Sequence, residues 1–250
     1  VETVAELNEV LHRKVDELET ANEDLEAFVS SVSHDLQAPL RAMEGFSQAL
    51  LEDCSGRLDG PCAEYAEWIA DGSERMSEMI HDLLDYCRLA RAELAARPVP
   101  LEVTFGEVRK SLEAEIHRTD ADITFDDGDL AVRAHPRTLA NMVANLVSNG
   151  LTYVEEGERP QVRVEAAARN GRVRVSVADR GIGIEERHQE RIFRIFERLH
   201  GLDRYRGTGI GLASVAKGAD RMDGAVGVES EPGEGSTFWI ELPMAGEEES

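Results

Sequence analysis

The sequence predicts an α + α/β chain, in which an N-terminal coiled coil runs into a dimeric antiparallel four-helix bundle and an α/β sandwich follows. Three observations predict this fold. Apolar residues first recur every seven positions, two long amphipathic patterns then flank a cluster of helix breakers, and mixed helix and strand patterns begin after Pro100. We place the coiled coil at residues 1–27, the helical hairpin at 28–97 and the α/β domain at 98–245.

The N-terminal repeat has the spacing of a coiled coil. Leu7, Ala21 and Phe28 fill its second apolar position, while Lys14 interrupts that position next to Val15, which indicates a shift in packing. A lone amphipathic helix that lies on a globular core is the alternative interpretation. The first apolar position is filled by Val4, Leu11, Leu18, Leu25 and Val32.

Two long helical patterns follow, with a hairpin turn between them. The first continues to Leu50 and the second extends from Tyr65 to Leu89. Residues 55–61 contain glycines and a proline, which predict the turn, and the proline-rich residues 97–100 end the second helix. Because two antiparallel helices cannot bury both apolar stripes alone, we expect a dimeric four-helix bundle.

The rest of the chain alternates between short helices and strands, which predicts an α/β sandwich. Pro136 suits the first turn of a helix, where a missing N–H leaves no hydrogen bond unmade. Asn170 and Gly171 form the usual sequence of a type I′ turn and predict a β-hairpin. We expect helices over residues 101–118 and from 136 to 146, and strands near 123–125, 130–133, 161–167, 172–178, 225–229 and 236–242.

The charge of the chain argues against nucleic acid as a partner. Its 50 acidic and 27 basic residues give a net charge of -23, whereas a surface that binds phosphate backbones needs Lys and Arg. No apolar run approaches the roughly 18 residues that span a bilayer, so we expect no membrane contact in this part of the chain and a cytoplasmic location. The three cysteines form no CxxC pair and predict reduced thiols.

A histidine and an acid lie side by side on the first predicted helix, as His34 and Asp35. Alone, such a pair on a helix is usually a solvated surface pair. Pro39 follows within the helical pattern, where a proline costs about 3 kcal/mol and kinks the helix. A kink beside an exposed imidazole is one reason for such a proline.

Two asparagines lie four residues apart on one face of the helix that starts near Pro136. Asn145 and Asn149 are followed at the same spacing by Tyr153. Amide oxygens can hold a Mg²⁺ ion that bridges nucleotide phosphates. From these residues alone, a structural cap or a surface pair is the stronger alternative.

Two glycine-rich segments could bind a nucleotide. Asp179 directly follows a predicted strand and could accept a hydrogen bond from the amino group of adenine. The glycines beside it let a flat ligand approach the backbone. The segment 207–212 precedes a helix and could hold phosphates with its N–H groups. No hydrophobic strand precedes this segment and no Gly-Lys-Ser/Thr follows it, which disfavours a dinucleotide-binding fingerprint and excludes a Walker A loop. A simple strand-to-helix turn at Asp179 remains the alternative.

The order and spacing of these motifs resemble the sensor histidine kinases over nearly the whole chain. Within that family the chain looks most like kinases of phytochrome-type or related cytoplasmic sensors. The matching segments are the phosphoacceptor motif at residues 33–41, the asparagine motif at 145–153, the first glycine motif at 179–183, the phenylalanine motif at 192–196, the second glycine motif at 207–212 and the closing strand at 235–238.

The resemblance implies a protein-histidine kinase with a dimerisation and phosphotransfer hairpin and a GHKL-type ATP-binding domain. His34 would take phosphate from ATP and pass it to an aspartate on the receiver domain of a response regulator, while Asp35 accepts the ring proton of His34. A homodimer and an upstream sensor domain are the further partners implied. The chain begins inside a helical pattern without a methionine, which also favours an upstream region.

The resemblance also implies the nucleotide site, with ATP and Mg²⁺ as cofactors. Asn149 would ligate Mg²⁺, Asn145 would support the phosphates, and Asp179 would hold adenine. Arg198 falls where the family has an arginine that reaches the phosphates. The remaining implied cofactor-binding residues are Tyr153, Gly181, Gly183, Gly207, Thr208, Gly209 and Gly211.

Three residues depart from the family pattern. Thr152 replaces a basic residue, which removes one phosphate contact, and Gly218 replaces an apolar helix former. Ala38 replaces the polar residue that many relatives use for phosphatase activity, so we expect this activity to be weak. A degenerate ATP-binding scaffold and an ATPase of the wider fold family remain the alternatives, although the hairpin with His34 argues against the ATPase.

Overall fold

The computed structural model describes residues 7, 14, 36–37, 39–51, 60–91, 94–199, 205 and 207–246. It divides into two compact units, a helical unit, Val1–Cys87, and an α/β unit, Arg88–Ser250. The predicted coiled coil over residues 1–27 lies outside the described residues except for Leu7 and Lys14, both helical. The predicted chain order of helices first and a mixed α/β region second is confirmed.

The helical unit contains two long helical segments, residues 39–51 and helix α2 (Gly60–Arg91). Each segment buries one stripe at a spacing of seven residues. A second stripe on each helix has the same spacing and stays half-exposed. The buried stripes contain Leu40, Ser47, Ala66, Ser73 and Ile80, and the half-exposed ones contain Leu36, Met43, Leu50, Ile69 and Met76. Among the described residues, no helix combines the length and the apolar character needed to cross a bilayer.

A five-stranded sheet forms the centre of the α/β unit, with the strand order β2-β4-β5-β7-β6. β2 pairs with β4 in parallel, and the other neighbours are antiparallel. The bounds are Asp122–Asp126 for β2, Gln161–Arg169 for β4, Arg172–Asp179 for β5, Ala225–Glu231 for β6 and Gly235–Pro243 for β7. The edge strand β2 is the shortest of the five.

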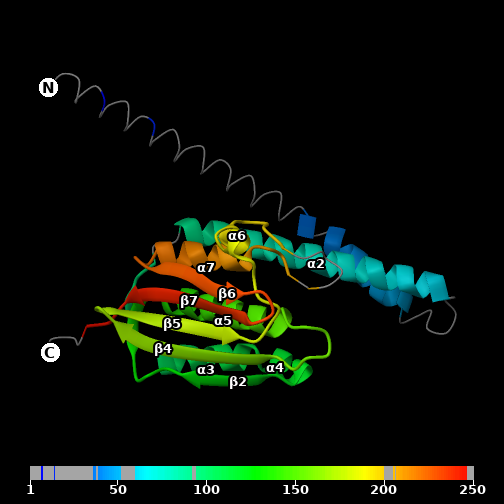
Figure 1. The fold of residues 1–250 in the computed structure, drawn as a ribbon. Helices are drawn as coiled ribbons and strands as arrows, with labels where there is room; N and C mark the ends of the chain where they lie inside the picture. Colours follow the sequence, from blue (N-terminus) through cyan, green and yellow to red (C-terminus); the bar gives the residue numbers. More distant parts are fainter. Residues whose placement is uncertain are drawn as a thin grey trace. The chain divides into compact units, whose positions relative to one another are not determined.

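Helices pack on one face of this sheet, as Figure 1 shows. The central helix is α5 (Pro136–Thr152), which contacts α3 (Leu101–Ser111) on one side and α7 (Gly211–Asp220) on the other. The buried residues of α5 pack against those of β4 and β5 in one hydrophobic core. This two-layer arrangement is the predicted α/β sandwich.

Local sequence explains where helix α5 begins and where the chain turns between β4 and β5. Pro136 occupies the first turn of α5, and the ring nitrogen Nδ1 of His135 accepts a hydrogen bond of 3.3 Å from the N–H of Thr138. Asn170 and Gly171 have φ values of 51° and 75°, which are the positive angles that a type I′ turn requires. Both sequence predictions, the helix start and the hairpin, are confirmed.

One strand was not predicted. Residues interpreted as the end of a helix instead form β1 (Arg97–Pro100), which pairs antiparallel with β3 (Ala131–Ala134). Its two prolines look like helix breakers in the sequence, yet proline is tolerated on an edge strand whose N–H faces away from the partner. The predicted helix over residues 101–118 also divides at Leu112 into α3 and α4 (Glu113–Thr119).

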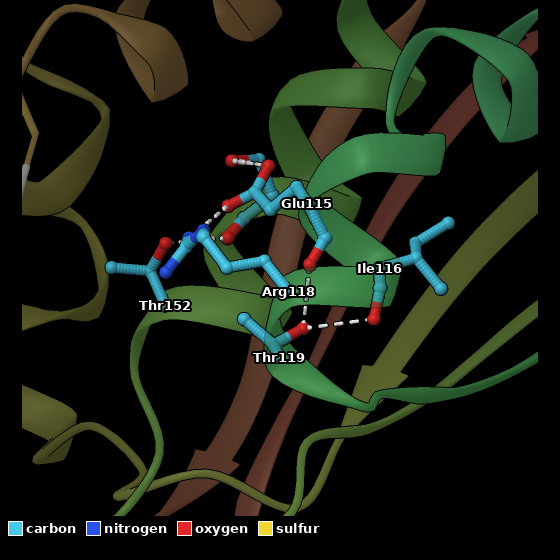
Figure 2. Close-up of polar contacts among 6 residues, drawn as sticks. Glu115, Ile116, Arg118, Thr119 and Thr152 are labelled. Atoms are coloured by element: carbon cyan, nitrogen blue, oxygen red, sulfur yellow. Dashed lines mark hydrogen bonds and ion pairs between the residues drawn. The ribbon is translucent and has the colours of Figure 1, made fainter.

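Polar contacts join α4 to the central helix, as shown in Figure 2. The hydroxyl of Ser148 donates to Oε2 of Glu115 over 3.4 Å, and Arg118 lies 3.9 Å from the other carboxylate oxygen of Glu115. The hydroxyl of Thr119 donates to the carbonyl of Glu115 at 2.8 Å, and that of Thr152 donates to the carbonyl of Ser148 at 2.8 Å. The hydroxyl of Thr152 is therefore used within its own helix.

Trp239 stands on the sheet face that points away from these helices. A Cβ atom added at Gly227 would lie 2.2 Å from its ring, so only glycine leaves room for the indole. The guanidinium of Arg174 covers the ring at 4.2 Å and forms an ion pair of 3.3 Å with Glu241. Cation–π attraction and the ion pair therefore hold the ring in place.

Candidate nucleotide site

The polar face of α5 carries the predicted asparagine motif. Asn145 and Asn149 lie one turn apart and are both half-buried, and Tyr153 ends the helix. The side-chain amide of Asn145 donates to the carbonyl of Gly211 over 3.4 Å. This contact joins the asparagine motif to the first residue of α7, which is part of the second glycine motif.

Asp179 ends strand β5, beside the C-terminus of α5. Its Oδ1 atom accepts hydrogen bonds from the N–H of Gly181 at 2.8 Å and from the N–H of Ser236 at 3.2 Å. Two donors from separate segments thus orient the carboxylate, and among the described residues no donor is assigned to Oδ2. That second oxygen can accept a hydrogen bond from a ligand.

The carboxyl group of Asp179 is difficult to ionise. Burial raises its pKa from 3.8 to about 6, although the N–H groups of Gly181 and Ser236 lower it in part. Burial has the larger effect because it removes water from the charged form. A perturbed carboxyl at the end of a strand is a frequent feature of functional sites.

The first glycine loop, residues 179–184, lies directly against the end of α5. A Cβ atom at Gly181 would lie 2.1 Å from the carbonyl oxygen of Tyr153, and the N–H of Ile182 donates to that oxygen at 3.0 Å. Gly183 has a φ of 68°, and a Cβ atom there would lie 2.0 Å from the carbonyl oxygen of Glu231. Both glycines are therefore required by close backbone contacts.

The second glycine loop, residues 207–211, passes over the residues of the phenylalanine motif. Gly209 has a φ of 75°, and its carbonyl accepts from the N–H of Phe196 at 2.9 Å. A Cβ atom at Gly207 would lie 3.5 Å from the hydroxyl of Tyr153. The hydroxyl of Thr208 accepts from the N–H of Ile210 at 3.3 Å, which shapes the turn into α7.

Arg198 lies beside the two tyrosines of the site. Its guanidinium donates to the carbonyl of Tyr205 at 2.9 Å, and the rings of Tyr205 and Tyr153 are 5.2 Å apart. Burial raises the pKa of Tyr153, and the positive charge of Arg198 opposes this shift. The site therefore has a cation next to a neutral, half-buried phenol.

The structure thus brings together Asn145, Tyr153, Asp179, Arg198 and the glycines of both loops. His34 and Asp35 lie outside the described residues, as does Ala38. Gly218 has a packing reason, because a Cβ atom there would lie 2.7 Å from Sδ of Met142 on the neighbouring helix α5. Close approach of two helices, rather than loss of function, accounts for this departure from the family pattern.

Three contributors were not predicted. Ser236 lies in the closing strand, and its N–H donates to Oδ1 of Asp179. Gln189 and Ser230 bond to the main chain around the first glycine loop. No motif or periodicity indicates side-chain to main-chain bonds between residues 41 positions apart, so the sequence carries no signal for them.

The donor set fits a nucleotide. The free oxygen of Asp179 can accept from an amino group on a base, and the N–H groups at the start of α7 can bind phosphate oxygens. Arg198 supplies a positive charge, and the amide oxygens of Asn145 and Asn149 are hard ligands suited to Mg²⁺. Carboxylates, which Mg²⁺ also prefers, are absent from the motif residues of α5.

Two family models match the chain, one in each of its parts. Residues 24–92 match the model described as "His Kinase A (phospho-acceptor) domain". Residues 134–246 match the one described as "Histidine kinase-, DNA gyrase B-, and HSP90-like ATPase". The first match includes His34, and the second includes all the glycines of the nucleotide site.

Curated relatives and a solved structure resemble both parts together. The chain is 34% identical to cyanobacterial phytochrome A of Nostoc over 93% of its own length and 30% of the relative's. It is 33% identical to the histidine protein kinase DivJ of Caulobacter vibrioides over 87% of its length and 37% of the relative's. The crystal structure of full-length ShkA in complex with AMPPNP is 30% identical, with a TM-score of 0.67 over 88% of this chain and 46% of that one. The chain therefore spans about a third of these curated relatives.

Proposed function

Because the chain belongs to the sensor histidine kinases, we propose that it transfers the γ-phosphate of ATP to His34 and then to an aspartate on a response-regulator receiver domain. The observation that carries the proposal is the orientation of Asp179, whose Oδ1 is bonded to two N–H groups while Oδ2 can accept from adenine. A fixed acceptor with one oxygen for the ligand is what selection of an amino-bearing base requires.

The first reaction is an in-line displacement at the γ-phosphorus. One ring nitrogen of His34 forms the new P–N bond, the bond from phosphorus to the β–γ bridging oxygen breaks, and ADP leaves. Asp35 accepts the proton on the other ring nitrogen, so that the imidazole stays neutral as it attacks. In the second reaction a carboxylate oxygen of the receiver forms a P–O bond as the P–N bond breaks, and the ring of His34 regains its proton.

Residues of the nucleotide site bind and orient ATP. Asp179 holds the base, while the N–H groups at the start of α7 and the loop glycines bind phosphate oxygens. Arg198 stabilises the charge that develops on the phosphoryl oxygens. Mg²⁺ would be held by Asn149 and would neutralise charge on the β- and γ-phosphates.

The helical unit supports assembly as a homodimer. Leu36, Met43 and Leu50 are 44–46% exposed and repeat every seven residues, and Ile69 and Met76 do the same on α2. A second copy would bury these stripes in a four-helix bundle, continued by the coiled coil of residues 1–27. The domain limits that we propose are those of the sequence, 1–27, 28–97 and 98–245. ATP as substrate favours a cytoplasmic location.

Phosphatase activity toward the phosphorylated receiver is expected to be weak. Ala38, one turn after His34, offers neither donor nor acceptor to orient a water molecule. Ala38→Thr should therefore speed phosphate release from a phosphorylated receiver. Equal release by both proteins would show that another group positions the water.

Incubation with γ-labelled Mg-ATP tests the proposal. The wild type should acquire an acid-labile, alkali-stable phosphate, which His34→Ala should lose while it keeps its affinity for ATP. Asn149→Ala should lose both labelling and Mg-ATP affinity. A wild type that binds ATP without labelling would favour the degenerate scaffold, which the missing cation at Thr152 also supports, and release of free phosphate without labelling would favour an ATPase.

A further inference from the structure

We propose that Gln189 is a positioning residue for adenine recognition, because it holds the first glycine loop and strand β6 in the register that orients Asp179. This inference rests on the proposed function and deepens it, since it concerns the selection of the base. Gln189 ends helix α6 (Glu186–Gln189), between the first glycine loop and the phenylalanine motif. Gln189 is not among the residues proposed to bind the base or the phosphates, and it acts through other residues.

The amide group of Gln189 bonds to two different segments. Its Nε2 donates to the carbonyl of Ser230 at 2.8 Å and to the carbonyl of Ile184 at 3.2 Å. A primary amide has two N–H hydrogens, and each carbonyl takes one. Since α6 has only four residues, these bonds do little for a helix and instead join the glycine loop to β6.

Ser230 continues the connection toward Asp179. Its hydroxyl accepts from the N–H of Ile184 at 2.8 Å, donates to the carbonyl of Gly235 at 2.8 Å and lies 3.0 Å from the hydroxyl of Ser236. Both main-chain groups of Ile184 are therefore held, the N–H by Ser230 and the carbonyl by Gln189. These contacts fix the glycine loop relative to the start of β7.

The carboxylate of Asp179 depends on both of these segments. Its Oδ1 accepts one hydrogen bond from Gly181 in the glycine loop and one from Ser236 in β7. If the loop moves relative to β7, the two donors no longer converge on one oxygen and the direction of Oδ2 changes. Gln189 thereby controls an acceptor that it does not contact.

Substitution of Gln189 should weaken discrimination between bases. Inosine triphosphate carries a carbonyl where ATP has the amino group, so the ratio of the two affinities measures the bond to Asp179. Gln189→Glu replaces the two donors by a negative charge that faces two carbonyl oxygens. It should lower the ratio of the ATP affinity to the inosine triphosphate affinity about tenfold. Gln189→Met has a similar length without donor or charge and should lower it about threefold.

The affinities of the full chain for both Mg-nucleotides can be measured by titration calorimetry, with melting temperatures for each variant. Arg187→Gln is the matched control, because it makes the same change in charge on α6 without a contact to Ile184 or Ser230, and it should leave the ratio unchanged. If Gln189→Glu fails to fold, the methionine variant provides the same comparison.

The outcomes separate the two proposals. A wild type with equal affinity for ATP and inosine triphosphate would contradict the assignment of Asp179 to adenine. A wild type that prefers ATP, together with Gln189 variants that keep the same ratio, would overturn the positioning role alone. A loss of stability that lowers both affinities equally would also count against it, because a purely structural residue gives that result.

Discussion

The N–H of Ser236 donates to Oδ1 of Asp179 over 3.2 Å, a contact between residues 57 positions apart. Together with the N–H of Gly181, it directs one oxygen of a half-buried carboxylate into the protein. Even with two donors, burial keeps the pKa of this carboxyl at about 6. The charge that would bind adenine is therefore maintained at a cost in stability.

Asp179→Asn should stabilise the α/β unit at neutral pH and abolish nucleotide binding. A pKa raised from 3.8 to about 6 contributes stability that is present below pH 3.8 and is lost as the pH rises through 6. Asn stays neutral and can keep both N–H bonds on its oxygen, so the gain at pH 7.5 should be on the order of 2 kcal/mol and should shrink at pH 5. Chemical denaturation at both pH values measures this. The exposed Asp122→Asn serves as control, and equal shifts in both variants would contradict the argument.

ATP selectivity should fall as the pH is lowered through about 6. A protonated Asp179 presents a hydroxyl, which repels the amino group of adenine and can donate to the carbonyl of inosine. Because both triphosphates titrate alike, the ratio of their dissociation constants isolates Asp179. Calorimetry between pH 5 and 8 should show a ratio that is flat above pH 7. A ratio that does not vary with pH would mean that Asp179 stays charged throughout.

Two helical glycines should respond oppositely to alanine. Gly106 in α3 has no atom within 4 Å of an added Cβ, whereas at Gly218 the Cβ would meet Met142 at 2.7 Å and Thr138 at 3.2 Å. Alanine favours a helix over glycine by about 1 kcal/mol, and overpacking costs about 1–3 kcal/mol. Gly106→Ala should therefore raise the melting temperature and Gly218→Ala should lower it. Stabilisation by both would show that the side chain of Met142 moves aside at little cost.

Thr152→Lys should tighten Mg-ATP binding. The hydroxyl of Thr152 bonds to its own helix, and the residue lies three positions after Asn149 on the polar face of α5. A lysine there places a positive charge toward the phosphates. The affinity for Mg-ATP should rise about threefold to tenfold, and added salt should reduce this gain. Thr152→Met, which adds length without charge, should show no gain. If lysine and methionine bind ATP equally, the phosphates do not reach this turn.

A charge on the half-exposed stripe should dissociate the proposed dimer. Met76 is 46% exposed and belongs to the stripe that a second copy would bury. Met76→Glu should shift the mass in solution from two chains to one, because an unpaired charge is costly in an apolar interface. Light scattering measures the mass, and His81→Glu on the exposed side of α2 is the control. A dimeric Met76→Glu protein would place the interface elsewhere.

Much of the fold was predictable because local chemistry determined it. Pro136 marked the start of α5, and Asn170-Gly171 marked the hairpin of β4 and β5. The sequence did not predict strand β1, because its prolines also fit the end of a helix. The cap by His135 was missed as well, since histidine is not among the usual capping residues.

The candidate site was predictable only as far as its motifs extend. The glycines could be located from sequence, but the reasons for them, such as the carbonyl of Tyr153 next to Gly181, are tertiary. The hydrogen bonds of Gln189 and Ser230 join side chains to distant main-chain groups. A sequence with the same hydrophobic periodicity need not form them. Their detection needed the folded chain.

The two tryptophans of the chain divide between its units, Trp68 in α2 and Trp239 in β7. Trp68 is 63% exposed, while Trp239 lies between Gly227 and the guanidinium of Arg174. Replacement of either one by phenylalanine leaves a single intrinsic fluorophore that reports on one unit only. Denaturation followed through each single-tryptophan protein would then reveal whether the helical and α/β units melt as one cooperative body or as two independent ones.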